Sequence, residues 1–277
     1  MPKVELKTGI SVYYEVSGEG MPLVFQGHSH LQYSFFQVPY FAKHYKVITF
    51  DRRGTGFSTS GGEDEWSIKT FSDDMDALLE AMGIRKAIVA GESLGGWIAA
   101  QFGLDHPEKA SALILAGNSL YVWDLKRQWL NEAIAAVNRG DTSLKAIYRQ
   151  PSSFDWEREG PYTVDPAFTN TKLGAYILSL LQDALGSGQD LVRMMEAAKM
   201  VDYRKRAEDF KRLQNVPTLV ILGGNESQRS IELAYEWYKL IPSSEFLILP
   251  NAYHLATVGH PEEWNGAVHE FLKRHNL

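Results

Sequence analysis

Short apolar runs rich in β-branched residues recur along the first 118 residues and return near the end of the chain. Each run stops at a glycine, an aspartate or another polar turn residue. Continuous apolar runs of this length, bounded by turn residues, are typical of buried strands in a mostly parallel sheet. The predicted strands are 10–16, 22–25, 46–50, 87–90, 112–116, 218–222 and 245–249.

Helical spacing of apolar residues appears between these runs. It predicts a helix over 71–82, with Gly83 as its C-terminal cap, a second over 94–104 and a last one over 261–273. Strands that alternate with helices indicate an α/β sheet covered by helices on both faces.

The pattern changes between residues 119 and 213, where strand-like runs nearly vanish and helical periodicity takes over. We therefore predict an α/β core over 1–118, a helical cap inserted over 119–213, and a second part of the core over 214–277. Aromatic residues are dense in the predicted cap: Tyr121, Trp123, Trp129, Tyr148, Phe154, Trp156, Tyr162, Phe168 and Tyr176.

Composition excludes several classes of function. The chain has 277 residues and a formal net charge of -6, without a long basic run, which argues against nucleic-acid binding. It has no cysteine, so disulfides, a thiolate nucleophile and cysteine-ligated metals are excluded. No run reaches the roughly 18 apolar residues of a membrane span, and the N-terminus lacks the apolar stretch of a signal peptide. We expect a soluble, cytoplasmic protein that contacts neither membrane nor nucleic acid.

The strongest chemical signal is the segment Gly91-Glu92-Ser93-Leu94-Gly95, which lies between a predicted strand and a predicted helix. A sharp strand-to-helix turn needs small residues on both sides and lifts the serine hydroxyl above the sheet. The helix that follows directs free backbone N–H groups toward developing negative charge. We predict that Ser93 is a nucleophile.

A serine nucleophile needs a base, and His254 is the best candidate among eight histidines. It follows the last predicted strand, in a loop at the carboxyl end of the sheet, where sites form in open α/β folds. His28 and His30 occupy another such loop and are expected to line the site. The remaining histidines are expected to be structural or exposed: His44, His106, His260, His269 and His275.

The base needs an acidic partner that fixes its tautomer. Glu226 follows the strand after the predicted cap and is our choice, with Asp124 as the second candidate. Asn118 also ends a strand but cannot ionise. An acyl-transfer intermediate also needs two donors for its oxyanion, and we assign them to the backbone N–H groups of Leu94 and His28.

These motifs together resemble the α/β-hydrolase superfamily, in its branch with a helical cap. The order Ser93, Glu226, His254 matches that family's order of nucleophile, acid and base. The segment 51–58 is similar to the family's D-x-R-G-x-G-x-S motif. The resemblance implies a mostly parallel eight-stranded sheet flanked by helices, with a cap after the sixth strand, and neither metal nor cofactor. The chain departs from the family in Gln26, where His is usual, and in Glu226, where Asp is usual.

The nucleophile indicates the reaction. Relatives that open epoxides or cleave carbon–halogen bonds use an aspartate at this position, so Ser93 favours an acyl-enzyme route. We expect hydrolysis of a carboxylic ester or lactone of a small, largely apolar molecule. The alternatives are a carbon–carbon bond hydrolase with the same triad, a cofactor-free dioxygenase, or a non-enzymatic ligand receptor.

Substrate contacts are expected from the predicted cap and the loop after the second strand. We assign them to His30, Tyr121 and Trp123, and we expect the cap aromatics with Met194, Met195 and Met200 either to line an apolar pocket or to form the cap's own core. The expected partner is a small-molecule substrate, and the expected assembly is a monomer or a homodimer.

Overall fold

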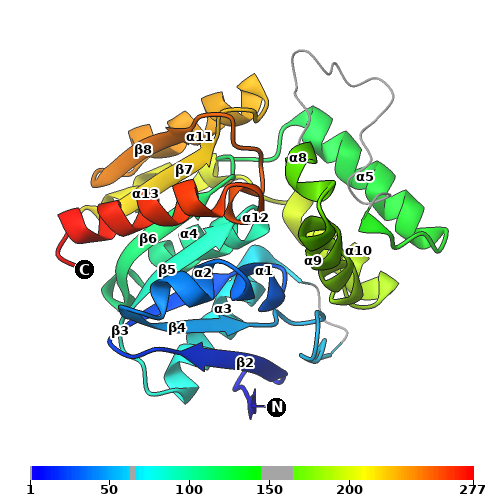
Figure 1. Cartoon of the computed structure of the whole chain (residues 1–277), viewed down its shortest axis with the longest axis horizontal. Coiled ribbons are helices and arrows are strands. Elements are labelled where there is room, and N and C mark those ends of the chain that lie inside the picture. Colours follow the sequence, from blue (N-terminus) through cyan, green and yellow to red (C-terminus); the bar gives the residue numbers. More distant parts are fainter. Residues whose placement is uncertain (1, 63–65, 145–164) are drawn as a thin grey trace.

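An eight-stranded sheet runs through the centre of the molecule (Figure 1). The structure is a computed structural model that describes residues 2–62, 66–144 and 165–277. The strand order is β1-β2-β4-β3-β5-β6-β7-β8; β2 pairs antiparallel with β1 and β4, and all later pairs are parallel. The predicted mostly parallel, eight-stranded sheet is confirmed. The strands are β1 (Lys3–Glu5), β2 (Ser11–Ser17), β3 (Met21–Gln26), β4 (Tyr45–Phe50), β5 (Ala87–Glu92), β6 (Ala110–Ala116), β7 (Thr218–Gly223) and β8 (Ser244–Leu249).

The central strands are buried on both faces. Along β5, Val89 belongs to one apolar core, while Ile88 and Ala90 belong to the other. Along β7, Val220 and Ile221 divide in the same way. Because successive side chains of a strand point to opposite faces, a strand covered on both sides must be apolar throughout. That is why these strands appear in the sequence as unbroken apolar runs.

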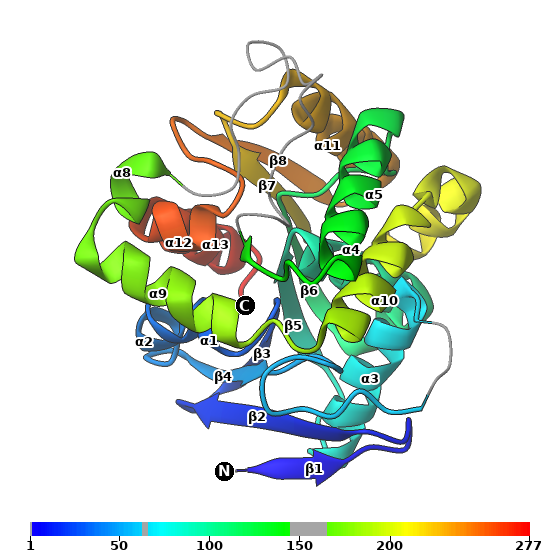
Figure 2. The ribbon, with the colours of Figure 1, turned by 90° about the vertical axis from the view of Figure 1, so that its right-hand side faces the viewer.

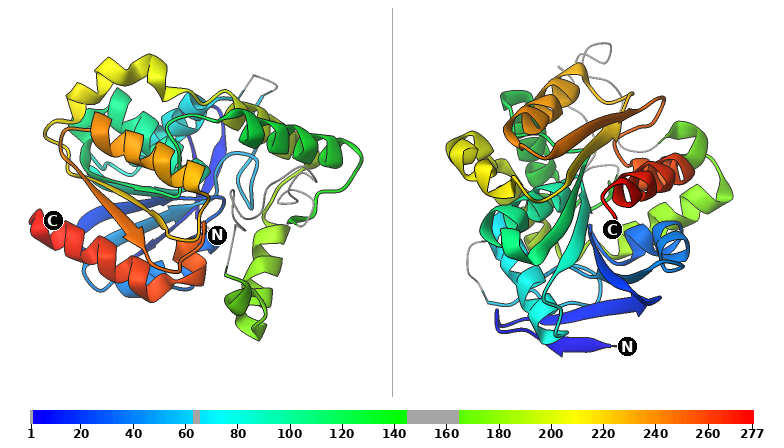
Figure 3. Two further views of the ribbon diagram at one scale, coloured as in Figure 1. Left: turned by 90° about the horizontal axis from the view of Figure 1, so that it is seen from above. Right: turned by 90° about the vertical axis from the view of Figure 1, so that its left-hand side faces the viewer.

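Helices cover both faces of the sheet (Figures 1 and 2). One face carries α3 (Ile68–Ala81), α4 (Leu94–Asp105) and α11 (Gln228–Leu240); the other carries α2 (Gln37–Phe41) and α13 (Pro261–Arg274). Figure 3 shows the twist of the sheet between these two layers. The remaining short elements are α1 (Leu31–Ser34), the 3-10 turn η1 (Pro107–Lys109) and α12 (Ala256–Gly259).

Helix α3 begins three residues before the predicted start. The Ser67 side chain accepts a hydrogen bond from the backbone N–H of Thr70, and the Thr70 hydroxyl accepts one from the Ser67 N–H. Such a reciprocal cap satisfies N–H groups that have no intrahelical acceptor, and so it fixes the first turn. At the other end Gly83 has a positive φ of 68°, as expected of a glycine that ends a helix.

The described chain between β6 and β7 is mostly helical, and its residues 124–138 and 166–199 lie to one side of the sheet (Figures 1 and 3). Its elements are α5 (Asp124–Asn138), α8 (Pro166–Thr169), α9 (Lys172–Asp183), α10 (Gly188–Lys199) and the 3-10 segment η2 (Tyr203–Leu213). The proposed cap boundaries at 119 and 213 remain a prediction. Four of the aromatic residues assigned to the cap lie outside the described residues: Tyr148, Phe154, Trp156 and Tyr162.

The segment η2 packs on the core rather than extending away from it. The Tyr203 hydroxyl donates to the Trp97 carbonyl oxygen at 2.8 Å, and the rings of Phe210 and Trp237 meet edge to face at 5.3 Å. Tyr203, Phe210 and Trp237 are all buried. The helical stretch from Tyr203 onward therefore packs against the core.

A buried ion pair joins the loop after β4 to α3. Arg53 donates from Nε and Nη2 to the two oxygens of Asp74 at 2.6 and 2.7 Å, and both side chains are less than a tenth exposed. Removing one partner of such a pair leaves an uncompensated charge in the interior. The pair thus holds the 51–58 segment against the helical layer.

We predict that Asp74→Ala lowers the free energy of unfolding by about 3–5 kcal/mol, because Arg53 remains buried without its carboxylate. Urea unfolding at neutral pH measures the change. Asp73→Ala is the matched control: Asp73 pairs with Lys69 on the exposed side of α3 and should cost only about 0.5 kcal/mol or less. Equal losses in the two variants would contradict the role given to the buried pair.

Candidate active site

Ser93 lies in a strained turn between β5 and α4. Its backbone has φ 57° and ψ -121°, a conformation that residues with a Cβ rarely adopt. A Cβ on Gly91 would overlap the Gly95 carbonyl oxygen, and a Cβ on Gly95 would overlap the Gln26 carbonyl oxygen. The two glycines flanking Ser93 are therefore required by close backbone approach, as the sequence motif predicts.

The loops after β7 and β8 bring Glu226 and His254 together. The Asn225 backbone N–H donates to the Ala252 carbonyl oxygen at 2.9 Å, and its side chain donates to the Asn251 carbonyl oxygen at 2.8 Å. Because β7 and β8 are adjacent and parallel, their carboxyl ends lie at one edge of the sheet, and these bonds hold the two loops in contact.

Ser93, His254 and Glu226 form one hydrogen-bonded chain. Nε2 of His254 lies 2.9 Å from Ser93 Oγ, and Nδ1 lies 3.0 Å from Glu226 Oε2. An ionised carboxylate can only accept, so Nδ1 carries the hydrogen and Nε2 is left to accept the serine proton. The arrangement is that of a nucleophile, a general base and the acid that orients the base.

Asp124, the second candidate for the acid, takes no part in the hydrogen bonds that join Ser93, His254 and Glu226. It is exposed at the first position of α5, while the Glu226 side chain is 5% exposed and contacts His254 directly. Glu226 is thus the carboxylate that the structure brings to His254.

The two expected oxyanion donors differ in whether their N–H group already has a hydrogen-bond acceptor. Leu94 is the first residue of α4, so its N–H has no acceptor within the helix. The His28 N–H, in contrast, donates to the side-chain oxygen of Gln32 at 2.9 Å. In this structure the Gln32 amide oxygen occupies the direction in which a substrate oxyanion would be bound by His28.

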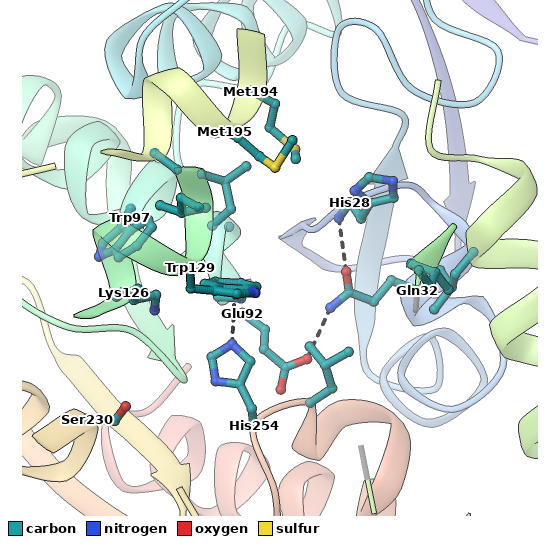
Figure 4. A pocket seen from close by; sticks show the side chains of 18 of the residues that line it. His28, Gln32, Glu92, Trp97, Lys126, Trp129, Met194, Met195, Ser230 and His254 are labelled. Carbon is teal, nitrogen blue, oxygen red and sulfur yellow. Dashed lines mark hydrogen bonds between the residues drawn. The ribbon is translucent and has the colours of Figure 1, made fainter. Parts of the chain in front are cut away.

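Gln32 is in turn held by a buried carboxylate. Its Nε2 donates to Glu92 at 3.1 Å (Figure 4), and Glu92 also accepts from the Thr257 backbone N–H at 3.2 Å and from the Thr257 hydroxyl. Burial raises the pKa of Glu92 to about 7, although the bonds from Thr257 oppose the rise. Glu92, which precedes Ser93 in the sequence, therefore supports the loop that carries the His28 N–H.

The His28 ring differs from the His254 ring in its hydrogen bonding. Its Nε2 is buried without a hydrogen-bond partner among the described residues. Burial, reinforced by the nearby charge of Arg52, lowers the pKa of His28 to about 3, so the ring is neutral at physiological pH. The His28 side chain thus lines the site as an uncharged group.

A largely apolar cavity of about 520 Å³ opens above Ser93. It is lined by the triad, by Trp123 as expected, and by side chains from α5, α9 and α10. Met194 and Met195 are among them, whereas Met200 is 74% exposed and lies outside the lining.

His30 does not lie in the cavity lining, contrary to expectation. Its backbone N–H and its ring Nδ1 both donate to Asp51 Oδ1, at 3.0 and 2.7 Å, and the side chain is buried. Asp51 also accepts from the Phe57 N–H at 2.8 Å. The His30 side chain therefore ties the loop after β3 to the loop after β4 and is unavailable to a substrate.

Tyr121, also expected to contact the substrate, lies outside the cavity lining. Its hydroxyl accepts from Arg229 at 2.6 Å, and the guanidinium of Arg204 lies 3.8 Å from the ring centroid. Its backbone pairs with Asp202 in an isolated bridge. The contacts with Asp202 and Arg204 connect the start of the helical stretch to its end, and the bond from Arg229 connects it to α11.

Several polar residues of the lining were not assigned to it from the sequence, among them Gln32, Lys126 and Ser230. For Lys126 the sequence did hold a signal. Trp123, Lys126 and Trp129 are spaced by three residues along α5, which places a charge on an aromatic helix face. For Gln32 the sequence held no such signal, because the position of its side chain depends on the fold of the surrounding loop.

Within the described ranges no cluster of histidine, aspartate and glutamate is arranged to hold a metal ion. In the same ranges no helix is both long and apolar enough to span a bilayer.

Comparison with known proteins agrees with the fold. The model of the alpha/beta hydrolase fold family matches residues 20–261, so the chain belongs to the α/β-hydrolase family. It is 26% identical over 243 residues to 2-hydroxy-6-oxo-6-(2'-aminophenyl)hexa-2,4-dienoic acid hydrolase of Metapseudomonas resinovorans, covering 86% of this chain and 77% of that protein.

Two solved structures show the same fold. The enol-lactonase from Burkholderia xenovorans LB400 superposes with a TM-score of 0.79 at 20% identity, covering 98% of this chain and 100% of the other. A thermophilic esterase from Thermogutta terrifontis has a TM-score of 0.76 at 20% identity and covers both chains completely, at 100% each.

We predict that Glu92 makes stability fall with rising pH. Its pKa is about 7 in the folded protein and about 4.5 in the unfolded chain, so the folded state binds more protons between these values. The stabilisation is complete below pH 4.5 and is lost as pH rises through about 7. Glu92→Gln removes this pH-dependent stabilisation. The unfolding free energy of the variant minus that of the wild type should therefore increase by roughly 3 kcal/mol from pH 4 to pH 8.

Urea unfolding of both proteins at several pH values measures this difference. Glu5→Gln is the control, because that carboxylate is exposed on the edge strand β1. A wild-type minus Glu92→Gln difference that stays constant with pH would show that the Glu92 pKa is not raised.

Proposed function

We propose that this protein is a serine hydrolase that cleaves a carboxylic ester or lactone through an acyl-enzyme on Ser93. The observation that carries the proposal is the hydrogen-bonded chain from Ser93 Oγ through His254 to Glu226, at the base of an apolar cavity. A serine hydroxyl is a weak nucleophile alone, and this chain supplies the base and the group that orients it.

The proposed reaction has two halves. Ser93 Oγ attacks the carbonyl carbon while its proton passes to His254 Nε2, and the alcohol leaves with that proton. Water then attacks the acyl-enzyme, gives a proton to His254 and releases the acid as Ser93 regains its hydrogen. Glu226 stays ionised throughout and stabilises the imidazolium.

The oxyanion is proposed to bind at the N–H groups of Leu94 and His28. The Leu94 N–H lies at the start of α4, where the helix dipole favours negative charge. The His28 N–H becomes available when the substrate oxygen displaces the Gln32 amide oxygen, which accepts from it at 2.9 Å. The resting enzyme would thus keep its donor satisfied by its own side chain until substrate binds.

The substrate is proposed to be small and largely apolar. The cavity volume of about 520 Å³ and its lining by Leu130, Leu181, Leu185 and the two methionines fit such a molecule. The helical stretch between β6 and β7 would serve as the cap that determines substrate choice.

A carbon–carbon bond hydrolase is the second candidate. It is favoured by the similarity to the dienoic acid hydrolase of Metapseudomonas resinovorans, at 26% identity. The same serine, histidine and carboxylate could serve that reaction, so the ester assay decides between the two.

We expect turnover of nitrophenyl esters to be greatest at a short or medium acyl chain and to be lost in Ser93→Ala. The cavity volume of about 520 Å³ limits the chain length, and the serine hydroxyl is the only nucleophile in the proposal. Release of nitrophenolate across a series of acyl lengths measures both effects. A folded wild type without ester turnover, but with cleavage of a vinylogous diketone, would favour the second candidate.

We expect Glu226→Gln to lower kcat by about 10³–10⁴-fold while the fold is retained, because the imidazole loses the charge that sets its tautomer. The matched control is Asp124→Asn, which removes the other candidate carboxylate and should leave kcat within about twofold. Steady-state kinetics on the best ester from the series gives both values. If Asp124→Asn is the damaging change, the assignment of the acid is wrong.

A further inference from the structure

Lys126 is a cation in an otherwise apolar wall of the pocket. Two cationic side chains line the described part of the pocket, Arg52 and Lys126. Arg52 is already engaged, since it donates to the Gly27 carbonyl oxygen at 3.3 Å and to the Met194 sulfur at 2.9 Å. Lys126 has no hydrogen bond or ion pair with any described residue, although its ammonium carries three N–H donors.

Aromatic rings hold the Lys126 ammonium in place. Its Nζ lies 5.0 Å from the ring centroid of Trp97 and 5.2 Å from that of Trp123. Rings attract a cation through their faces and do not use its N–H donors as a carboxylate would. Figure 4 shows Lys126 beside Trp97, on the other side of the pocket from His28 and Gln32. Among the described residues, the ammonium is therefore held in place by ring contacts while its N–H donors remain unused.

Lys126 stays largely cationic at neutral pH, although burial favours its neutral form. Burial lowers the pKa of the Lys126 ammonium to about 8, and the negative charge of Glu226 opposes this change. No ion pair within 4.0 Å joins the two groups, so Glu226 does not occupy the donors of Lys126. Within the described part of the chain Lys126 has no hydrogen-bonded partner; a buried charge of this kind is costly, and such groups are concentrated at functional sites.

We propose that Lys126 forms an anion subsite, which binds a free carboxylate carried by the ester or lactone substrate. This inference rests on the proposed function of the same pocket and narrows its substrate class to monoesters of dicarboxylic acids, or lactones that bear a carboxylate. The apolar lining would contact the carbon chain between the two ends. A carboxylate accepts charge-assisted hydrogen bonds from an ammonium, and these are about twice as strong as neutral ones.

The test compares matched substrates. Monomethyl esters of dicarboxylic acids from succinate to suberate are each paired with a methyl alkanoate in which a methyl group replaces the carboxylate, and hydrolysis is followed by proton release. The measured quantity is the ratio of kcat/KM for the acid over its neutral match. For the best chain length, Lys126→Met should lower this ratio by about 10- to 100-fold, and Lys126→Arg should retain most of it.

Lys172→Met is the matched control, because Lys172 is an exposed lysine at the start of α9 and should leave the ratio unchanged. A ratio that Lys126→Met does not change would overturn the subsite. Equal losses for the acid and for the neutral ester would also overturn it, since Lys126 would then act through Glu226. Circular dichroism shows whether each variant is folded. If Lys126→Met does not fold, the ratio measured for Lys126→Arg still tests the subsite.

Binding to Ser93→Ala separates this inference from the proposed function. Calorimetric titration with monomethyl adipate should give a Kd about 10- to 100-fold weaker in Ser93→Ala/Lys126→Met than in Ser93→Ala. If that difference is found without ester turnover in the wild type, the hydrolase proposal fails and the subsite stands. If monomethyl adipate binds both variants no better than methyl hexanoate, the subsite fails whatever the turnover.

Discussion

The backbone conformation of Ser93 is the constraint on which the site depends. A residue with a Cβ at φ 57° is disfavoured by about 1–3 kcal/mol, so the surrounding structure must impose it. The Ser93 N–H donates to the Ala116 carbonyl oxygen at 2.8 Å, which attaches the turn to β6. Gly91 and Gly95 allow neighbouring backbone to approach from both sides. The turn can therefore direct the hydroxyl away from the sheet while its backbone remains hydrogen-bonded.

The sheet order determines what faces that hydroxyl. Strand β5 lies between β3 and β6, so the loop after β3 reaches one side of Ser93, and the loops after β7 and β8 reach the other. Gly117, which follows β6 at φ 58°, lies directly beside the His254 ring, where an added Cβ would be 3.3 Å from it. Each group of the triad is thus set by a different strand end, and the parallel direction of the strands makes these ends converge.

Sequence reasoning succeeded where the cause was local. The apolar runs predicted the long strands because both faces of the sheet are covered, and the glycine motif identified the turn at Ser93 because close packing admits no side chain. Strand β1 was missed because it is three residues long and largely exposed at the sheet edge. The early start of α3 depends on the Ser67 cap, which lies outside the apolar pattern.

Errors arose where a side chain had two possible partners. His30 and Tyr121 follow strands at the carboxyl edge, so their positions in the chain were compatible with substrate contact. Asp51 binds the first and Arg229 the second, and neither partner is near in sequence. The partner of the His28 N–H is near in sequence: the long Gln32 side chain, four residues away, folds back over the loop and accepts from it. Side-chain partners of this kind are decided by tertiary geometry.

Glu92 and Lys126, together with Arg52, contribute to the electrostatics of the pocket from outside the triad. Glu92 lies on the side of the oxyanion loop and Lys126 on the side of α5, with the triad facing the same cavity. Charges interact strongly where water is excluded, so the ionisation of both groups affects the charges that develop during the reaction. A bound carboxylate near Glu226 would be repelled without a cation close by. Lys126 supplies that cation without forming an ion pair with Glu226, so the triad acid stays available to His254 while an anionic substrate is held.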